Sequence, residues 1–185
     1  MRFSPFRRAR PASRTWNAAK TLVQITVLWS LALWIVPVLI AGMERRWLPA
    51  SRLVALPRFG LTALLICSTV GLWAGWAIVR DGEGTPLPLD TTRRLVTRGP
   101  YAFVRNPMAI TGVGQGLSAG LMLGSPGVLM YALAAALVWN YWMRPAEERD
   151  LRQQFGAAFD SYCRVVGCWI PRWPALLRRG PGAGR

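Results

Sequence analysis

Long apolar stretches alternate with short charged segments along this chain, a pattern that predicts membrane helices. Two stretches, at about residues 21–42 and 59–79, contain no charged residue. At 1.5 Å per residue, each is long enough to cross roughly 30 Å of hydrocarbon. Two shorter stretches follow at about 107–123 and 126–143, separated only by Gly124 and Ser125. Because Pro126 suits the first position of a helix, this second pair is expected to form a tight hairpin.

A further helix is predicted after the hairpin. Pro145 can open it, and Leu151, Phe155, Phe159 and Tyr162 recur at helical spacing on one face. Such an amphipathic helix is expected to lie on the cytoplasmic surface of the membrane. The predicted fold class is therefore all-α, an integral membrane bundle of about four transmembrane helices with an amphipathic C-terminal helix.

Composition supports one membrane domain. Of 185 residues, 52% are apolar and ten are Trp, which leaves little material for a separate soluble core. We assign the domain to residues 21–171. A basic tail at 1–20 precedes it and is interpreted as part of an uncleaved anchor. Residues 172–185 are rich in Gly, Pro and Arg and are expected to be disordered.

Charge predicts the orientation of the chain. Lys and Arg number 23 against 8 acids, but they flank the apolar stretches, which favours membrane anchoring over nucleic-acid binding. Nineteen lie in segments 1–20, 80–105 and 144–185, and only four lie in 43–58. The positive-inside bias therefore places both termini in the cytoplasm. Arg outnumbers Lys 22 to 1, which suggests a GC-rich bacterial genome and hence a bacterial cytoplasmic membrane.

Metal and disulfide chemistry have little support. The chain has no His, Cys67 lies inside an apolar stretch, and Cys163 and Cys168 lack a second pair. We expect no metal site.

Glycine recurs at every fourth position of the third stretch, at Gly112, Gly116, Gly120 and Gly124. A nucleotide-binding glycine loop would need a preceding strand, whereas this sequence lies inside an apolar helix. The repeat therefore predicts close packing between helices, and it also leaves room for a ligand groove.

Charged residues at the two ends of the hairpin are the candidate site. Arg105 and Asn106 precede the first helix, and Arg144, Glu147 and Glu148 follow the second. A hairpin returns the chain to its starting side, so these groups should meet. Each has a simpler explanation: an arginine can reach the lipid phosphates, and acids in a first turn favour the helix dipole.

Together, LVTRGPYAFVRNPM, the hairpin, the paired glutamates, FGAAFDSY and WIP resemble the isoprenylcysteine carboxyl methyltransferase and phospholipid methyltransferase superfamily, over about residues 84–171. Its central motif, Arg-His-Pro-x-Tyr-x-Gly, begins here at Arg105. Asn106 replaces the His, Ala109 replaces the Tyr, and Gly112 comes one position late.

The resemblance implies a membrane enzyme that binds S-adenosylmethionine at the cytoplasmic face and takes a lipophilic or lipid-modified acceptor from the bilayer. Carried over by position, the catalytic or acceptor-binding candidates are Arg105 and Arg144. The implied cofactor-binding residues are Leu95, Val96, Tyr101, Asn106, Pro107, Met108, Glu147 and Glu148.

The acceptor class is argued from the chemistry that the chain lacks. With no His and few acids, removing a proton is hard to arrange, so an acceptor that is already ionised, such as a carboxylate, is favoured. Two alternatives stay open: a phospholipid or amine N-methyltransferase, and a non-catalytic membrane scaffold or transporter.

Overall fold

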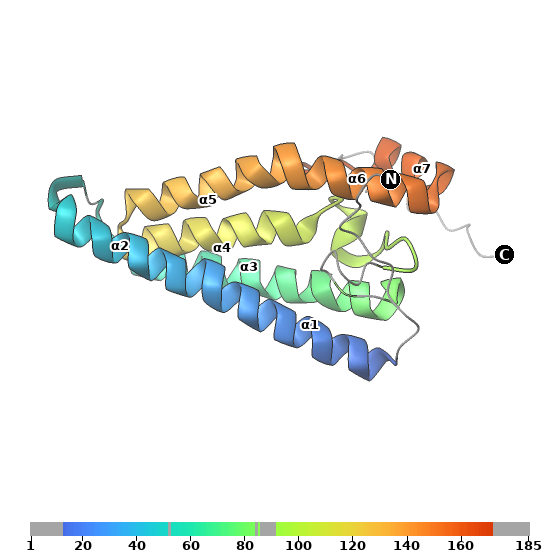
Figure 1. Ribbon diagram of the computed structural model, residues 1–185, viewed down its shortest axis with the longest axis horizontal. Coiled ribbons are helices and arrows are strands. Elements are labelled where there is room, and N and C mark those ends of the chain that lie inside the picture. The colour runs from blue at the N-terminus through green and yellow to red at the C-terminus, as the bar shows by residue number, and fades with distance from the viewer. Residues whose placement is uncertain (1–12, 52, 84, 86–91, 172–185) are drawn as a thin grey trace, which may run out of the picture.

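The structure is a computed structural model that describes residues 13–51, 53–83, 85 and 92–171. Within these residues the named elements are all helices. Figure 1 shows long helical rods lying side by side, with α6 and α7 at the end of the bundle where α1 begins. The predicted tail at 172–185 and the first twelve residues of the tail at 1–20 lie outside the described residues.

The first rod joins α1 (Arg14–Trp29), the π-helical segment η1 (Ser30–Ile35) and α2 (Val36–Trp47). Ser13 caps it, with its hydroxyl accepting a hydrogen bond from the Trp16 amide at 3.2 Å. The helix therefore starts before the predicted span, and residues 14–20 of the predicted basic tail form its first turns. A 3₁₀ turn, η2 (Pro49–Ser51), follows.

The second rod joins α3 (Pro57–Ala77) to the π-helical η3 (Ile78–Gly82). Glycines on α3 allow α4 to approach closely. A Cβ added at Gly60 would lie 2.8 Å from the Ser118 carbonyl oxygen, and one at Gly71 would lie 3.0 Å from the Thr111 hydroxyl. Helices α3 and α4 therefore pack closely along each other.

The hairpin has the predicted form. Helix α4 (Pro107–Leu123) ends at Gly124, whose φ of 58° suits glycine, and Ser125 caps α5 (Pro126–Val138), which continues into the π-helical η6 (Trp139–Met143). A Cβ added at Gly116 would lie 2.9 Å from Ala132 Cβ, and one added at Gly120 would lie 2.6 Å from Leu129 Cδ2. The predicted glycine packing therefore occurs at these two positions.

Two helical segments, Thr15–Trp47 and Pro57–Gly82, are long and apolar enough to cross a membrane among the residues described. They coincide with the first two predicted spans. Helix α4 has 17 residues, and α5 reaches a comparable length only with η6. The count of four transmembrane helices therefore stays a prediction.

The C-terminal region differs from the single amphipathic helix that we predicted. Helix α6 (Arg144–Phe155) continues directly from η6, and α7 (Ala157–Val165) begins after a break at Gly156, where φ is 51°. Phe159 is 1% exposed. The apolar face is thus folded against the bundle at this residue, because glycine lets α7 turn back on the chain.

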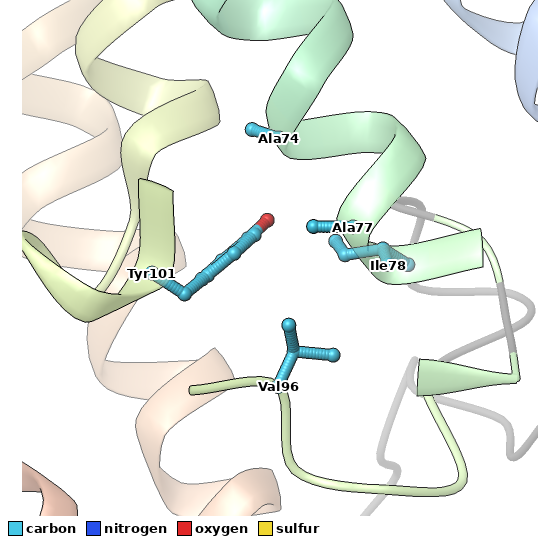
Figure 2. Packing of buried hydrophobic residues seen from close by; sticks show 5 residues of the cluster. All are labelled: Ala74, Ala77, Ile78, Val96 and Tyr101. Atoms are coloured by element: carbon cyan, nitrogen blue, oxygen red, sulfur yellow. The ribbon is translucent and has the colours of Figure 1, made fainter. Parts of the chain in front are cut away.

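A small hydrophobic cluster anchors the loop before α4. Figure 2 shows the Tyr101 ring pointing from the 3₁₀ turn η5 (Gly99–Ala102) toward Ala74 and Ala77 of α3, with Val96 beside it. The alanines leave room for the ring. Packing of this kind holds the loop at the end of the bundle, directly before Arg105.

Candidate functional site

A cleft at this end of the bundle brings together nine of the ten predicted site residues. Its walls include Leu95, Val96, Tyr101, Arg105, Asn106, Met108, Arg144, Glu147 and Glu148. Pro107 does not line the cleft. It is buried at the first position of α4, where a proline's fixed φ and missing N–H suit a helix start.

Asn106 joins the two ends of the hairpin. Its side-chain oxygen accepts a hydrogen bond from the Ala109 amide at 3.0 Å and so caps α4. Its side-chain nitrogen donates to a carboxylate oxygen of Glu147, also at 3.0 Å. A single side chain therefore starts one helix and orients an acid on another.

Arg105 ties the same two ends to the C-terminal segment. Its guanidinium lies 2.9 Å from a Glu148 oxygen and donates to the carbonyl oxygens of Cys163 at 3.3 Å and Val166 at 3.1 Å. The backbone N–H of Arg105 donates to the Gly167 carbonyl at 2.9 Å. The pKa of Arg105 is raised: burial lowers it, but the charge and hydrogen bond of Glu148, together with the nearby Cys163 and Cys168, outweigh that effect.

Arg144 approaches the same carboxylate from the other side. Its Nε lies 3.5 Å from the Glu148 oxygen that Arg105 contacts, and its Nη1 donates to Asn140 Oδ1 at 2.8 Å. Trp169 Nε1 donates to the same amide oxygen at 2.9 Å. The buried Nε of Arg105 makes no hydrogen bond with a described residue, and the buried Nε of Arg144 has only the 3.5 Å contact with Glu148. Two cations thus share one acid, and Arg105 keeps a spare donor.

Glu147 is the most perturbed carboxyl group of the site. Burial raises its pKa to about 7, with a further upward effect from Glu148, against the hydrogen bond from Asn106, which lowers it. The group therefore changes charge near neutral pH. Perturbed groups of this kind are common at functional sites.

Several residues of the site were not predicted. Tyr162 donates to the Tyr101 carbonyl oxygen at 2.6 Å, and Phe159, Leu151 and Trp139 also line the cleft. Leu151, Phe159 and Tyr162 belong to the apolar face that we predicted, but we assigned that face to the membrane surface. Sequence periodicity shows that a face is apolar and does not show what covers it.

A second cavity, of about 460 Å³, lies between α1, α4 and α5. Its lining is mostly apolar and includes Leu28, Gly112 and Ala132. Four residues line both spaces: Asn106, Met108, Trp139 and Glu147. The cleft and the cavity therefore meet at one wall, beside the Asn106–Glu147 hydrogen bond.

No cluster of three or more His, Cys, Asp or Glu side chains that could hold a metal ion occurs in the described part of the chain. Comparison with protein families matches residues 58–158 to the phospholipid methyltransferase family. The match begins in α3, includes the whole hairpin and ends in α7. Among curated proteins, no match to the chain is found.

Proposed function

The chain belongs to the phospholipid methyltransferase family, whose members are membrane methyltransferases, and from this premise we propose that it transfers a methyl group from S-adenosylmethionine to a lipophilic acceptor at the cytoplasmic face of a bacterial membrane. The observation that carries the proposal is the wall shared by a polar cleft and an apolar cavity. A charged donor and a lipid acceptor need two such spaces, joined where the methyl group moves.

The groups of the cleft suit a zwitterionic cofactor. When bound, S-adenosylmethionine supplies an electrophilic methyl group on a sulfonium centre. Glu147 and Glu148 would face its positively charged groups, and the Nε donor of Arg105, which has no partner among the described residues, suits its carboxylate. Leu95, Val96 and Tyr101 would supply an apolar wall for the adenine base.

The orientation that we propose places the cleft toward the cytoplasm, where the cofactor is. The cation-rich segments 80–83, 92–105 and 144–171 lie at this end, and α1 begins there as well (Figure 1). In this arrangement all four helical rods span the bilayer, and the acceptor reaches the shared wall from the lipid. The protein's contribution is to align the two reactants and exclude water from the junction.

A carboxylate-bearing lipid is our first candidate acceptor. The two guanidinium groups share one carboxylate, so Arg105, Arg144 and Glu148 carry a net positive charge beside the junction as long as Glu147 holds its proton. This charge favours an anionic group. A carboxylate also attacks without first losing a proton.

A lipophilic amine is the second candidate, and Glu147 is the observation that favours it. The lack of His and the scarcity of acids disfavoured an amine acceptor, which needs a base. Glu147, however, lies at the shared wall with a pKa of about 7. A carboxylate with such a pKa can take a proton from an ammonium group.

Methylation of defined lipids with labelled S-adenosylmethionine tests the proposal. The purified protein is incubated with octadecanoate, octadecylamine or phosphatidylethanolamine, and label in the lipid fraction is counted. We expect label on the carboxylate lipid; label on the amines alone identifies the second candidate. Glu147→Gln, which removes the carboxylate at the shared wall, should lower the label, whereas the matched control Asp160→Asn, which alters an exposed pair with Arg152, should not. Absence of label from all lipids, including a total lipid extract, contradicts both.

A further inference from the structure

The cavity between α1, α4 and α5 is lined by two glutamines, Gln24 and Gln115, whose side-chain oxygens are buried and accept no hydrogen bond from the described residues. Gln115 is the more buried of the two, with 1% of its surface exposed. Its Nε2 donates to the Ser68 hydroxyl at 2.9 Å, which leaves only its Oε1 without a partner. A buried polar atom without a partner costs free energy that an apolar side chain would avoid.

The two hydroxyl-bearing side chains on α4 form hydrogen bonds within the helix. Thr111 donates to the Met108 carbonyl oxygen at 3.1 Å, and Ser118 donates to the Gly114 carbonyl oxygen at 2.7 Å. Gln115 differs because its amide has two polar atoms and only one of them is used. The unused atom therefore points to a ligand group rather than to helix packing.

The chemistry of the missing partner follows from the amide. In the orientation described, Oε1 needs a hydrogen-bond donor. With the amide turned over, Oε1 would accept from Ser68 and Nε2 would need an acceptor. A hydroxyl group both donates and accepts, so it satisfies Gln115 in either orientation.

The position of Gln115 fixes where that hydroxyl lies on the ligand. Asn106, at the shared wall, and Gln115 are nine residues apart on α4. At 1.5 Å per residue, the separation along the helix axis is about 13.5 Å. The neighbouring Gly112 leaves space between them, because a Cβ added there would meet nothing within 4 Å.

We propose that the cavity binds the hydrocarbon chain of the methyl acceptor and that Gln115 recognises a hydroxyl group in the middle of this chain. The inference rests on the proposed function, because it takes the shared wall as the position of the methylated group. It narrows the acceptor to a hydroxylated lipid. The hydroxyl lies about 13.5 Å from the reactive end, near the twelfth carbon of a straight chain.

Two fatty acids that differ only at this position test the inference. Binding of 12-hydroxyoctadecanoate and of octadecanoate to the purified protein is measured by calorimetry in the same detergent. We expect the hydroxylated probe to bind about tenfold more tightly, the effect of one hydrogen bond to a buried group. Equal affinities for wild type, or no binding of either probe, would overturn the inference.

Gln115→Met shows whether the preference arises at this residue. Methionine has a similar length and no amide, so the variant should bind both probes equally. Ser68, left without Gln115, can donate to its own helix as Thr69 does to Leu65. Gln24→Met removes the other unpaired amide oxygen of the cavity and should keep the preference; loss of the preference in this variant would place the hydroxyl at Gln24 and contradict the inference. A preference that persists in Gln115→Met would place the hydroxyl elsewhere and contradict the inference.

The same samples separate this inference from the proposed function. S-adenosylhomocysteine is titrated into wild type and Gln115→Met, and both should bind it equally, which also shows that the variant is folded. Normal binding of S-adenosylhomocysteine without a hydroxyl preference overturns only the inference. Failure of the wild type to bind S-adenosylhomocysteine instead overturns the cofactor assignment.

Discussion

The side-chain nitrogen of Asn106 donates a hydrogen bond to Glu147 across 3.0 Å, and these two residues stand at opposite ends of the α4–α5 hairpin. Forty residues of sequence separate them from each other. The hairpin closes that distance because Gly124 and Ser125 reverse the chain within two residues. A cleft that depends on this contact is therefore sensitive to changes on either side of it.

Stability should depend on pH through Glu147. The folded state holds its proton up to a pKa of about 7, against an ordinary value of 4.5. The folded state therefore loses stability as pH rises through this window, and the loss is complete above pH 7. The upper limit is roughly 3 kcal/mol, at about 1.4 kcal/mol per unit. Glu147→Gln lacks the penalty, so its melting temperature should exceed that of wild type at pH 8 and approach it at pH 5.

The sign of this difference separates burial from a helix-dipole effect. If Glu147 only stabilised the first turn of α6, its removal would destabilise the protein by about 0.3–1 kcal/mol at pH 8. Asp160→Asn, in the first turn of α7, should show only the helix-dipole behaviour, because its side chain is 45% exposed. A lower melting temperature for Glu147→Gln at pH 8 would contradict the burial account.

Arg105 should not be replaceable by lysine. The guanidinium contacts Glu148 and two backbone carbonyl groups at once, and lysine cannot span that arrangement. Arg105→Lys should lower the free energy of unfolding by roughly 1.5–3 kcal/mol, the range for hydrogen bonds to charged groups. Denaturant titration in detergent measures it. Arg80→Lys, at an exposed pair with Asp81, is the control and should change little. Equal losses for the two variants would show that Arg105 is an ordinary surface cation.

Leucine at two glycine positions of α4 should have different effects, on activity at one and on stability at the other. Gly112 faces the cavity and Gly116 lies against Ala132. Gly112→Leu should fold, bind S-adenosylhomocysteine normally and lose methylation of lipids, because its side chain fills the acceptor cavity. Gly116→Leu should destabilise the bundle by about 1–3 kcal/mol through overpacking. Melting curves and label transfer are measured for both. Full activity in Gly112→Leu would show that the acceptor does not bind in this cavity.

Reporter fusions test the orientation. Nineteen Lys and Arg residues flank one side of the predicted spans and four flank the other, so both termini are expected in the cytoplasm. Fusions after Arg185 should give cytoplasmic signals, and fusions in the 43–58 connection should give periplasmic ones. A periplasmic signal after Arg185 would place Glu147 on the side without cofactor.

The bundle was largely predictable because apolar length and helix-start residues are local signals. The predicted bounds of the third span coincide with α4, since Asn106, Pro107 and Gly124 determine its ends. The break at Gly156 was missed, because a glycine inside a periodic apolar pattern does not by itself show that the helix ends.

The candidate site was predictable in part for the same reason. Because a hairpin returns the chain to its starting side, Arg105 was expected near Glu148, and the two form an ion pair. Contacts such as Tyr162 to Tyr101 depend on how α7 folds back, and the cavity depends on the spacing of three helices. Neither is encoded in a short motif. The pKa of Glu147 could not be predicted either, because it arises from burial among residues distant in sequence.

The most direct test of the central claim is a calorimetric titration of S-adenosylhomocysteine into wild type and Glu147→Gln at pH 8. At this pH the carboxylate is ionised and can accept a charge-assisted hydrogen bond from the ligand. The account predicts saturable binding to wild type and a ten- to hundredfold weaker affinity for the variant, or roughly 1.5–3 kcal/mol. Equal affinities, or no binding to wild type, would contradict it.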